Sequence, residues 1–547
     1  MLAWLASALI GGAGALAVFP LSVMAGTSAY WDFPHGVVGG SWADMATSLS
    51  GYETFVRQGW TWPLLSVSGL GGAAGTNIIF TDSTPVLALL GRVLFRLTGT
   101  FVPLYGPWSG FCVVAMALAS TALVRALGAR SPMAAAAAAA IGVSMPALLA
   151  RWGHLSLMAE WLVPLSLAAY VSLHRARRLH AMPTFGIVTG LSALSLLIHP
   201  YLFFMTGAVM GTVPLQAVRT GRMRLVTALA VLLAAAASLV VLMASMGHLS
   251  GAALEPAGGF GIYSTNLVSA FVPQLSGVLP FGPDFIIGGA WGQYEGFAYL
   301  GLGVLVLLWI SRLSLLTRAT LRAHPFLLAV VLGCTVLAVS NTVYLAQFHL
   351  FTVPLPDAVL RLVGIVRSSG RFIWVPVYLG AGLAVAAAAR HPRAGIILLA
   401  AAALQWADAG PLRAMVRDSV ASSAPPALDR SAWASALATV DRVVVDPPWQ
   451  CIPNRADAAW FYHAAIEVQL MASATGRATN TIYAARVTPD CTVPPLTPGT
   501  LVIHLHGPAA LVPPADFCQS SPNITACSLS LPADVLRGLT QVDTTLE

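Results

Sequence analysis

Eleven apolar segments, each close to the roughly 20 residues that an α-helix needs to cross a lipid bilayer, recur along the first 410 residues of the chain. Of the 547 residues, 57% are hydrophobic and only 9% are charged, which is typical of multi-pass membrane proteins. The pattern predicts an all-α polytopic membrane domain with about eleven transmembrane helices over residues 1–410. The predicted spans lie near residues 4–24, 108–126, 132–149, 153–173, 183–199, 201–218, 224–246, 297–311, 325–345, 372–389 and 395–409.

Arginine clusters fall in alternate loops between these segments, as the positive-inside rule requires of cytoplasmic loops. The N-terminus is therefore predicted in the cytoplasm, with the long loop 25–107 and everything after about residue 410 on the exterior face. The first segment has no basic residues before it and no convincing cleavage site, so we interpret it as a retained helix. Because topology accounts for the arginines, nothing indicates nucleic-acid binding. The clusters contain Arg125, Arg130, Arg175, Arg177, Arg178, Arg219, Arg222, Arg224, Arg312, Arg318, Arg322, Arg390 and Arg393.

A separate soluble domain is predicted over residues 411–547, because the apolar segments stop near Pro411 and Pro, Asp, Thr and Ser become frequent. The segments 442–446 (RVVVD) and 500–506 (TLVIHLH) are typical of short buried strands, and 457–474 is typical of a helix between them. Together they predict a small α/β domain on the exterior side of the membrane.

Four cysteines in this exported domain predict two disulfides, with buried reduced cysteines as the alternative. The sequence does not distinguish the three pairings, although Cys518 and Cys527 are close enough to close a short loop. His504 and His506 alternate onto one strand face, but no acid or third ligand accompanies them at a metal-binding spacing. A partly exposed strand end is therefore favoured over a metal site. The four cysteines are Cys451, Cys491, Cys518 and Cys527.

Two acids in the long first exterior loop differ in how well an ordinary structural role explains them. Asp82, Ser83 and Pro85 open the segment 78–95 in the way typical of a helix start, with Asp or Ser as the N-cap. We therefore predict that Asp82 caps the helix, and keep it as a candidate substrate-binding residue. Asp44 has no basic residue three or four positions away, and its small and apolar neighbours indicate a packed helix. An acid in that setting is a candidate general base or ligand.

Ionisable and aromatic side chains embedded in apolar sequence gather at the predicted exterior ends of the spans. Each has an ordinary explanation, since a histidine can bond to backbone at a helix end and an acid can interact favourably with a helix dipole. As a set, however, they converge around the loop that carries Asp44, and ionisable residues at membrane depth are costly and usually functional. The candidate substrate-binding residues are His154, His199, Tyr201, Glu295, Arg367 and Arg371.

Five short segments follow one another in a characteristic order: FTDSTP (80–85), RWGHLSLMAEW (151–161), IHPYLFF (198–204), QYEGFAYLGLG (293–303) and RSSGRFIW (367–374). With these segments, most of residues 1–410 resembles a bacterial group of membrane proteins related to the GT-C glycosyltransferases. The resemblance implies a multi-helix enzyme of the bacterial inner (plasma) membrane that takes a sugar from a polyprenyl-phosphate carrier and passes it to an acceptor on the exterior face.

The catalytic acid of that superfamily typically sits in the first exterior loop, which by position implies Asp44. The chain lacks the Asp-Asp, Asp-Glu or Asp-x-Asp pair that is common there. The resemblance therefore leaves the use of a divalent cation, Mg²⁺ or Mn²⁺, open and assigns no metal ligand.

Transfer from a lipid-linked sugar phosphate needs a base for the acceptor hydroxyl and cations or donors for the departing phosphate. We predict Asp44 as the base, Arg367 and Arg371 as guanidinium forks for the phosphate, and His154 or His199 as a further donor. A single displacement of a hexosyl or pentosyl group by one acid would invert the anomeric centre. The expected partners are the polyprenyl-phosphate-linked sugar, membrane lipid, and an exterior glycan or lipid acceptor.

Two other classes of membrane protein remain as alternatives. A flippase or transporter of lipid-linked sugars is expected to show polar or broken segments near mid-membrane and often an internal repeat, and neither is evident. A surface-polysaccharide polymerase or ligase also uses polyprenyl-linked donors with Arg and His on the exterior face. The long first loop with its acid and the soluble C-terminal domain favour the GT-C interpretation.

Overall fold

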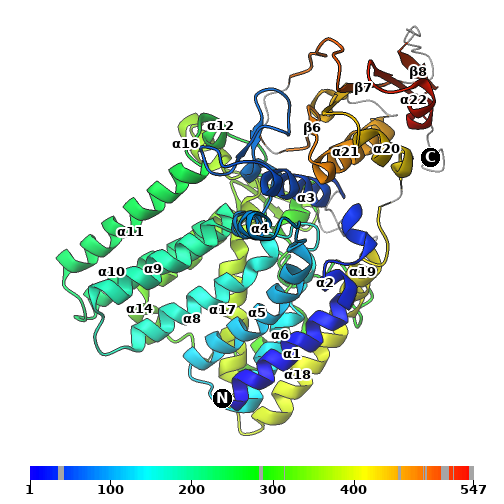
Figure 1. Cartoon of the computed structure of the whole chain (residues 1–547). Helices are drawn as coiled ribbons and strands as arrows, with labels where there is room; N and C mark the ends of the chain where they lie inside the picture. Colours follow the sequence, from blue (N-terminus) through cyan, green and yellow to red (C-terminus); the bar gives the residue numbers. More distant parts are fainter. Residues whose placement is uncertain are drawn as a thin grey trace.

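Apolar helices make up most of the structure, and a small sheet-containing region lies beside one end of their bundle (Figure 1). The structure is a computed structural model. It describes residues 1–34, 42–281, 288–312, 314–424, 426–453, 458–484, 486, 490–506, 517–521 and 523–540.

Each predicted span contains a helix, but the helices differ in length. Among the described residues, six helical stretches are long and apolar enough to cross a membrane, and the pair α18 and α19 (Gly410–Ser419), bent by 45°, is a seventh if it forms one span. The protein is thus a multi-pass membrane protein, while the predicted count of about eleven spans is not confirmed, because α1, α9, α13 and α15 are shorter. The helices are α1 Leu2–Val18, α5 Tyr105–Ala126, α6 Pro132–Val143, α8 Leu162–Arg175, α9 Ala181–Leu196, α10 Pro200–Arg219, α11 Leu225–Met246, α13 Leu302–Ser311, α15 Pro325–Val339, α17 Trp374–Ala388 and α18 Ala394–Asp408.

Small residues allow the first helices of the bundle to pack closely. A Cβ atom at Gly11 of α1 would lie 2.9 Å from the Cα of Val114 in α5, and one at Gly14 would lie 3.1 Å from the side chain of Val143 in α6. Without a strong hydrophobic force between helices in lipid, such close backbone approach supplies the van der Waals contact that holds them together. The Ala-rich and Gly-rich composition of these segments therefore serves packing.

The two ends of the bundle differ in character. At one end, α3 (Trp42–Arg57), the 3-10 turn η2 (Ile78–Thr81) and α4 (Pro85–Thr98) pack on one another and cover the helix ends (Figure 1). At the other end, Arg219 and Arg222 donate to the main-chain carbonyls of Ala323 (3.0 Å) and Leu173 (2.8 Å), which draws three arginine-rich loops together. The helices α8, α10 and α17 each run from the covered end to the arginine-rich end.

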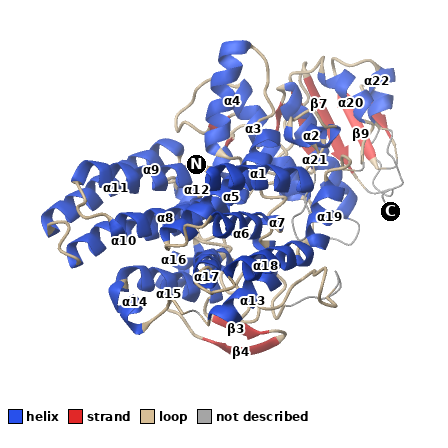
Figure 2. Ribbon diagram, turned by 90° about the horizontal axis from the view of Figure 1, so that it is seen from below, coloured by secondary structure: helices blue, strands red, loops and turns tan. Residues whose placement is uncertain are grey.

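The C-terminal region contains the predicted mixture of strands and helices. Its five-stranded sheet has the order β6-β5-β7-β9-β8, in which β5 pairs in parallel with β6 and β7, and β9 is antiparallel to β7 and β8. Figure 2 shows α20, α21 and α22 beside this sheet, and the separate β3–β4 hairpin elsewhere on the molecule. The elements are β3 Thr342–Leu345, β4 Phe348–Thr352, α20 Arg430–Leu437, β5 Arg442–Asp446, α21 Ala458–Thr475, β6 Ala478–Thr479, β7 Thr500–Leu505, β8 Cys518–Ser520, β9 Ile524–Ser528 and α22 Ala533–Leu539.

Two disulfides, Cys451–Cys491 and Cys518–Cys527, lie in this region. They represent one of the three pairings that the sequence leaves open. The end of the parallel strand β5 places Asp446 2.8 Å from the Nδ1 atom of His504, so an acid that lies 58 positions away in the sequence accompanies this histidine in the fold. Within the described part of the chain no group of three His, Cys, Asp or Glu side chains is arranged to hold a metal ion.

Candidate active site

A cavity of about 360 Å³ lies at the covered end of the bundle, between the helix ends, α3 and residues of the C-terminal region. Its polar wall includes every residue that the sequence analysis selected for catalysis or substrate binding. Local sequence places each of them at a helix end or in a turn, so that the chain reversals bring them to one level. These residues are Asp44, Asp82, His154, His199, Tyr201, Glu295, Arg367 and Arg371.

Asp44 lies in the first turn of α3 and faces the cavity with 22% of its side chain exposed. Its Oδ2 atom is 3.8 Å from Nε2 of His154, and its carboxylate also forms a hydrogen bond with the side chain of Tyr483. Burial raises the pKa of Asp44 above that of an ordinary aspartate, and His154 and Tyr483 only partly offset this effect. A carboxylate with a raised pKa is a better proton acceptor than an exposed one.

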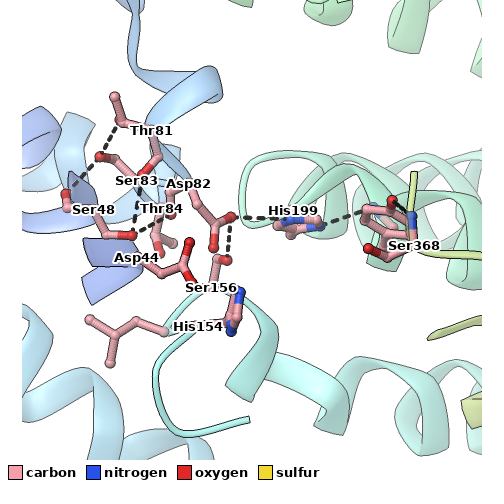
Figure 3. Close-up of polar contacts among 12 residues, drawn as sticks. Asp44, Ser48, Thr81, Asp82, Ser83, Thr84, His154, Ser156, His199 and Ser368 are labelled. Atoms are coloured by element: carbon pink, nitrogen blue, oxygen red, sulfur yellow. Dashed lines mark hydrogen bonds and ion pairs between the residues drawn. The ribbon is translucent and has the colours of Figure 1, made fainter. Parts of the chain in front are cut away.

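Asp82 does not cap a helix, so this part of the sequence-based prediction is wrong. The N-cap residue of α4 is Thr84, and Asp82 has a left-handed backbone conformation with φ 56° at the end of η2. This turn directs its carboxylate to Nε2 of His199 (3.1 Å) and to the hydroxyl of Ser156, which donates to it at 2.8 Å (Figure 3). The local sequence pattern of a cap and that of a sharp turn are the same here, and tertiary contacts decide between them.

The pairing of Asp82 with His199 fixes the tautomer of the histidine. His199 is the N-cap residue of α10, where its Nδ1 atom accepts a hydrogen bond from the N–H of Tyr201 (3.1 Å). A neutral ring therefore carries its proton on Nε2, which points at Asp82. Burial lowers the pKa of His199. Burial alone would raise the pKa of Asp82, but His199 and Ser156 hold it below its ordinary value.

Glu295 links two arginines at the base of the cavity wall. Arg371 directs Nε (2.9 Å) and Nη2 (2.7 Å) at the two carboxylate oxygens, and Nη1 of Arg151 lies 2.7 Å from Oε2. Burial alone would raise the pKa of Glu295, but the two guanidinium groups keep it well below its usual range. One carboxylate between two guanidinium groups leaves a net positive charge beside the cavity.

Arg367 has a different environment from Arg371. Its Nη2 atom donates to the hydroxyl of Tyr263 (2.6 Å), and its guanidinium group lies 4.7 Å from the centre of that ring. It forms no ion pair with an acid among the residues that the structure describes, and its side chain is exposed to the cavity. Arg367 therefore presents an unneutralised positive charge, whereas Arg371 is largely committed to Glu295.

Several residues in or beside the cavity wall were not identified from the sequence. Arg151, which pairs with Glu295 behind the lining, stands three residues before His154 and could have been selected by the same reasoning. His248 is 8% exposed, its Nε2 atom has no hydrogen-bond partner among the described residues, and burial lowers its pKa to about 4, so it is a neutral ring at the cavity. Tyr483 and Arg486 come from the C-terminal region, and no local pattern connects them to the site.

The donor set around the cavity does not resemble a cage for a divalent cation. Asp44 and Asp82 each lie beside a histidine, and Glu295 is neutralised by arginines. No three acid, histidine or cysteine side chains in the described ranges are placed to bind one ion. Mg²⁺ and Mn²⁺ prefer several oxygen ligands, so these residues do not fit either ion.

Apolar side chains also line the cavity, and they come largely from the ends of α10 and α11 and the segment before η5 (Ser369–Ile373). Phe204 on α10 is 44% exposed, which is consistent with a surface that faces lipid or a lipid chain. The cavity is thus lined by both charged and apolar side chains. The apolar residues include Ile79, Phe80, Pro200, Phe204, Met243, Leu254, Ile365 and Val366.

The fold and this cavity define a multi-pass membrane protein whose candidate site lies at one end of the helix bundle. The family model described as Domain of unknown function (DUF6311) matches residues 8–410, and the one described as DUF6311 C-terminal domain matches residues 432–496. The chain belongs to the DUF6311 family.

Comparisons of this chain with curated proteins and with solved structures show only a distant similarity. No curated protein matches the chain. It is similar to the crystal structure of the Archaeoglobus fulgidus oligosaccharyltransferase tethered through a disulfide bond to an acceptor peptide containing the NVT sequon, with 11% sequence identity and a TM-score of 0.41. The match covers 87% of this chain and 64% of that one, so the chain spans less than two thirds of the oligosaccharyltransferase.

Proposed function

We propose that this protein is a membrane glycosyltransferase that moves a sugar from a polyprenyl-phosphate carrier to a glycan or another acceptor on the exterior face. The observation that carries the proposal is one cavity whose lining combines the carboxylate of Asp44, guanidinium groups without an acidic partner among the described residues, and apolar side chains. A base, an anion-binding group and a lipid-facing surface are the three features that this reaction needs.

The reaction follows from the charges around the cavity. An acceptor hydroxyl oxygen attacks C1 of the sugar, its proton passes to Asp44, and the bond between C1 and the phosphate oxygen breaks. The electron pair of that bond leaves with the polyprenyl phosphate, whose negative charge is stabilised by Arg367 and by the cluster of Glu295 with Arg151 and Arg371. One displacement without a covalent intermediate inverts the configuration at C1.

The histidines support the two aspartates. His154 lies 3.8 Å from Asp44, close enough to reorient and donate to the carboxylate or to a sugar hydroxyl once substrate enters. His199 is held by Asp82 and by the backbone of α10, so its ring has a fixed orientation and forms a rigid part of the sugar pocket. Tyr201 accepts a hydrogen bond from the N–H of Ser368 (2.7 Å), which ties the start of α10 to the loop of Arg367.

The polyprenyl chain is proposed to lie against the apolar wall formed by Pro200, Phe204, Met243 and Leu254. Pro200 and Phe204 lie at the start of α10 and Met243 lies near the end of α11, two helices that are long and apolar enough to cross a membrane. Such a position lets the phosphate reach Arg367 while the hydrocarbon remains in an apolar environment.

The site is proposed to open on the exterior face of a bacterial inner membrane, because the arginine-rich loops lie at the opposite end of the same helices. A single cysteine introduced beside Arg177 should react with an impermeant thiol reagent only in broken cells, and one at Ala474 should react in intact cells. The reverse labelling pattern would overturn this orientation.

The experiment that tests the function uses purified wild-type protein in detergent with radiolabelled polyprenyl-phosphate sugars and a delipidated cell-envelope extract as acceptor source. We expect the label to leave the lipid fraction and to appear in a water-soluble or glycan-bound product. If the same protein, reconstituted into vesicles, moves the label across the membrane without releasing it from the lipid, the protein is a flippase. If pre-assembled lipid-linked oligosaccharides are joined while single sugars are not transferred, it is a polymerase or ligase.

A further inference from the structure

A segment of the C-terminal region enters the cavity of the membrane domain. Residues 480–484 together with Arg486, here called the crossing segment, follow β6 and place Tyr483, Ala484 and Arg486 in the cavity wall. Main-chain hydrogen bonds between Thr479 and both Gly69 (3.0 Å) and Gly71 (3.0 Å) attach its start to the first exterior loop. The crossing segment therefore spans from the sheet of one domain into the site of the other.

A buried glutamine joins the crossing segment to the helix that carries Asp44. Gln469 of α21 donates through Nε2 to the hydroxyl of Thr47 (2.7 Å) and accepts through Oε1 from the N–H of Tyr483 (2.9 Å). The hydroxyl of Thr47 in turn donates to the carbonyl of Tyr483. Thr47 is three residues after Asp44 and so lies on the same face of α3. These bonds hold Tyr483 at Asp44.

Arg486 lies at the edge of the cavity that also carries Arg367. Its Nη2 atom donates to the carbonyl of Ile365 (2.7 Å), two residues before Arg367, and its Nη1 atom donates to the carbonyl of Ala253. These bonds satisfy the hydrogen-bonding capacity of the carbonyl oxygens. They do not neutralise the positive charge of Arg486, because a carbonyl group has no net charge. Within the described ranges neither Arg486 nor Arg367 has an acidic ion-pair partner, in contrast to Arg371 with Glu295.

We propose that the C-terminal domain completes the active site, with Tyr483 as a positioning residue for Asp44 and Arg486 as a phosphate-binding partner of Arg367. The proposal rests on the proposed function and corrects the expected phosphate pair, because Arg371 is occupied by Glu295. Two guanidinium groups in the lining of one cavity match a phosphate better than one, since each supplies directed N–H donors and charge.

The position of Tyr483 has a consequence for pH dependence. A hydroxyl that donates to a carboxylate stabilises its ionised form, so removing that hydroxyl raises the pKa of Asp44 further. The other titratable groups facing Asp44 are His154, Asp82, Glu295 and Tyr294, and none of them is substituted in a Tyr483 variant. Tyr483→Phe should therefore move the acid limb of the transfer rate to higher pH by about 0.5 to 1 unit.

The control for this measurement is Tyr462→Phe. Tyr462 lies in the same C-terminal region, where its hydroxyl donates to the carbonyl of Ile452 (3.3 Å) away from the cavity. Its substitution should leave the pH profile of the wild type unchanged. A Tyr483→Phe protein that folds and has the wild-type profile would overturn the positioning role.

The phosphate-binding role is tested by binding alone, without turnover. Detergent-solubilised wild type should bind a short-chain polyprenyl phosphate more tightly than the matched polyprenyl alcohol, and Arg486→Gln should reduce this preference by about tenfold. Arg486→Lys should retain part of it, because the charge remains but the planar fork is lost. The matched control is Arg361→Gln on α16 (Asp357–Gly364), an exposed cation outside the cavity wall.

The outcomes separate this inference from the proposed function. If wild type transfers sugar and prefers the phosphate over the alcohol while folded Arg486→Gln does the same, the role of Arg486 is wrong and the glycosyltransferase remains. If wild type itself does not prefer the phosphate, the anion site is wrong. If the preference depends on Arg486 but no sugar is transferred from any donor, the anion site stands and the transferase proposal fails.

Discussion

The carboxylate of Asp82 lies 3.1 Å from Nε2 of His199, a residue that stands at the start of α10. This contact fastens the long loop 25–107 to a membrane helix at the edge of the cavity. It also turns Asp82 from the expected helix cap into a residue of the site. The cavity is held together by such contacts between segments that are distant in the sequence.

The first prediction concerns the stability that Asp82 provides. In Asp82→Ala the Nε2–H of His199 and the hydroxyl of Ser156 lose their acceptor in a buried place, which should lower the free energy of unfolding by about 1–3 kcal/mol. Asp82→Asn keeps an acceptor oxygen and should cost less. Thermal unfolding of the purified variants measures both. Thr84→Ala is the matched control, because Thr84 is the N-cap residue of α4 but makes no side-chain capping bond.

A destabilisation by Thr84→Ala that equals that of Asp82→Ala would contradict this reading. It would mean that the start of α4, and not the contact with His199, is the source of the stability.

The sequence predicts that the site residues lie close together, because each of them stands at the predicted exterior end of its own span. His154, His199 and Arg371 follow or precede apolar segments whose direction through the membrane alternates, and this alternation alone brings them to one level. The helix positions follow from the apolar segments for the same reason. Span lengths were less predictable, because a short helix such as α13 is as apolar as a full span, and the bend between α18 and α19 leaves no mark in the hydropathy.

Pairing between side chains was not predictable in this way. Nothing local indicates that Glu295 lies between Arg151 and Arg371, or that Arg371 is therefore less available to a phosphate than Arg367. The entry of Tyr483 and Arg486 into the cavity depends on how the C-terminal region docks on α3, which is set by contacts between residues far apart in sequence.

The second prediction concerns Glu295. Glu295→Gln leaves the guanidinium groups of Arg151 and Arg371 buried close together without a counter-charge, so it should lower the free energy of unfolding by about 3–5 kcal/mol. Thermal unfolding in detergent measures the change. Glu255→Gln, an exposed acid at the same end of the bundle, should have little effect. Equal stability of the two variants would show that the charge cluster does not hold the helix ends together.

The third prediction is a pH dependence of transfer. Because burial raises the pKa of Asp44, its carboxylate takes up a proton at a higher pH than an ordinary aspartate does. The ionised form is the base, so kcat/KM should rise with pH through a pKa above 3.8 and fall on acidification. A profile measured with wild-type protein that remains flat down to the ordinary range of aspartate would argue against Asp44 as the titrating base.

The fourth prediction concerns divalent cations. Guanidinium groups supply the positive charge in this cavity, and the described acids lie against histidines or arginines. Transfer should therefore continue after dialysis against EDTA. The measurement compares rates before and after dialysis and after the return of Mg²⁺ or Mn²⁺. If transfer is lost on dialysis and Mg²⁺ or Mn²⁺ restores it, the prediction is wrong. The acids would then have to leave their present partners to bind the ion.

The fifth prediction tests the central claim, that Asp44 is the base of a glycosyl transfer in this cavity. Asp44→Asn keeps the size of the side chain but cannot accept the proton, so the transfer rate with a polyprenyl-phosphate sugar should fall by about 10²–10⁴. Binding of the polyprenyl phosphate should persist, and Asp32→Asn, which changes an exposed acid of the same loop, should match wild type. The decisive measurement is the single-turnover rate of sugar transfer by equal amounts of folded wild type, Asp44→Asn and Asp82→Asn. Only Asp44→Asn should lose transfer to this extent. Near wild-type transfer by Asp44→Asn, together with abolished transfer by folded Asp82→Asn, would show that Asp44 is not the base.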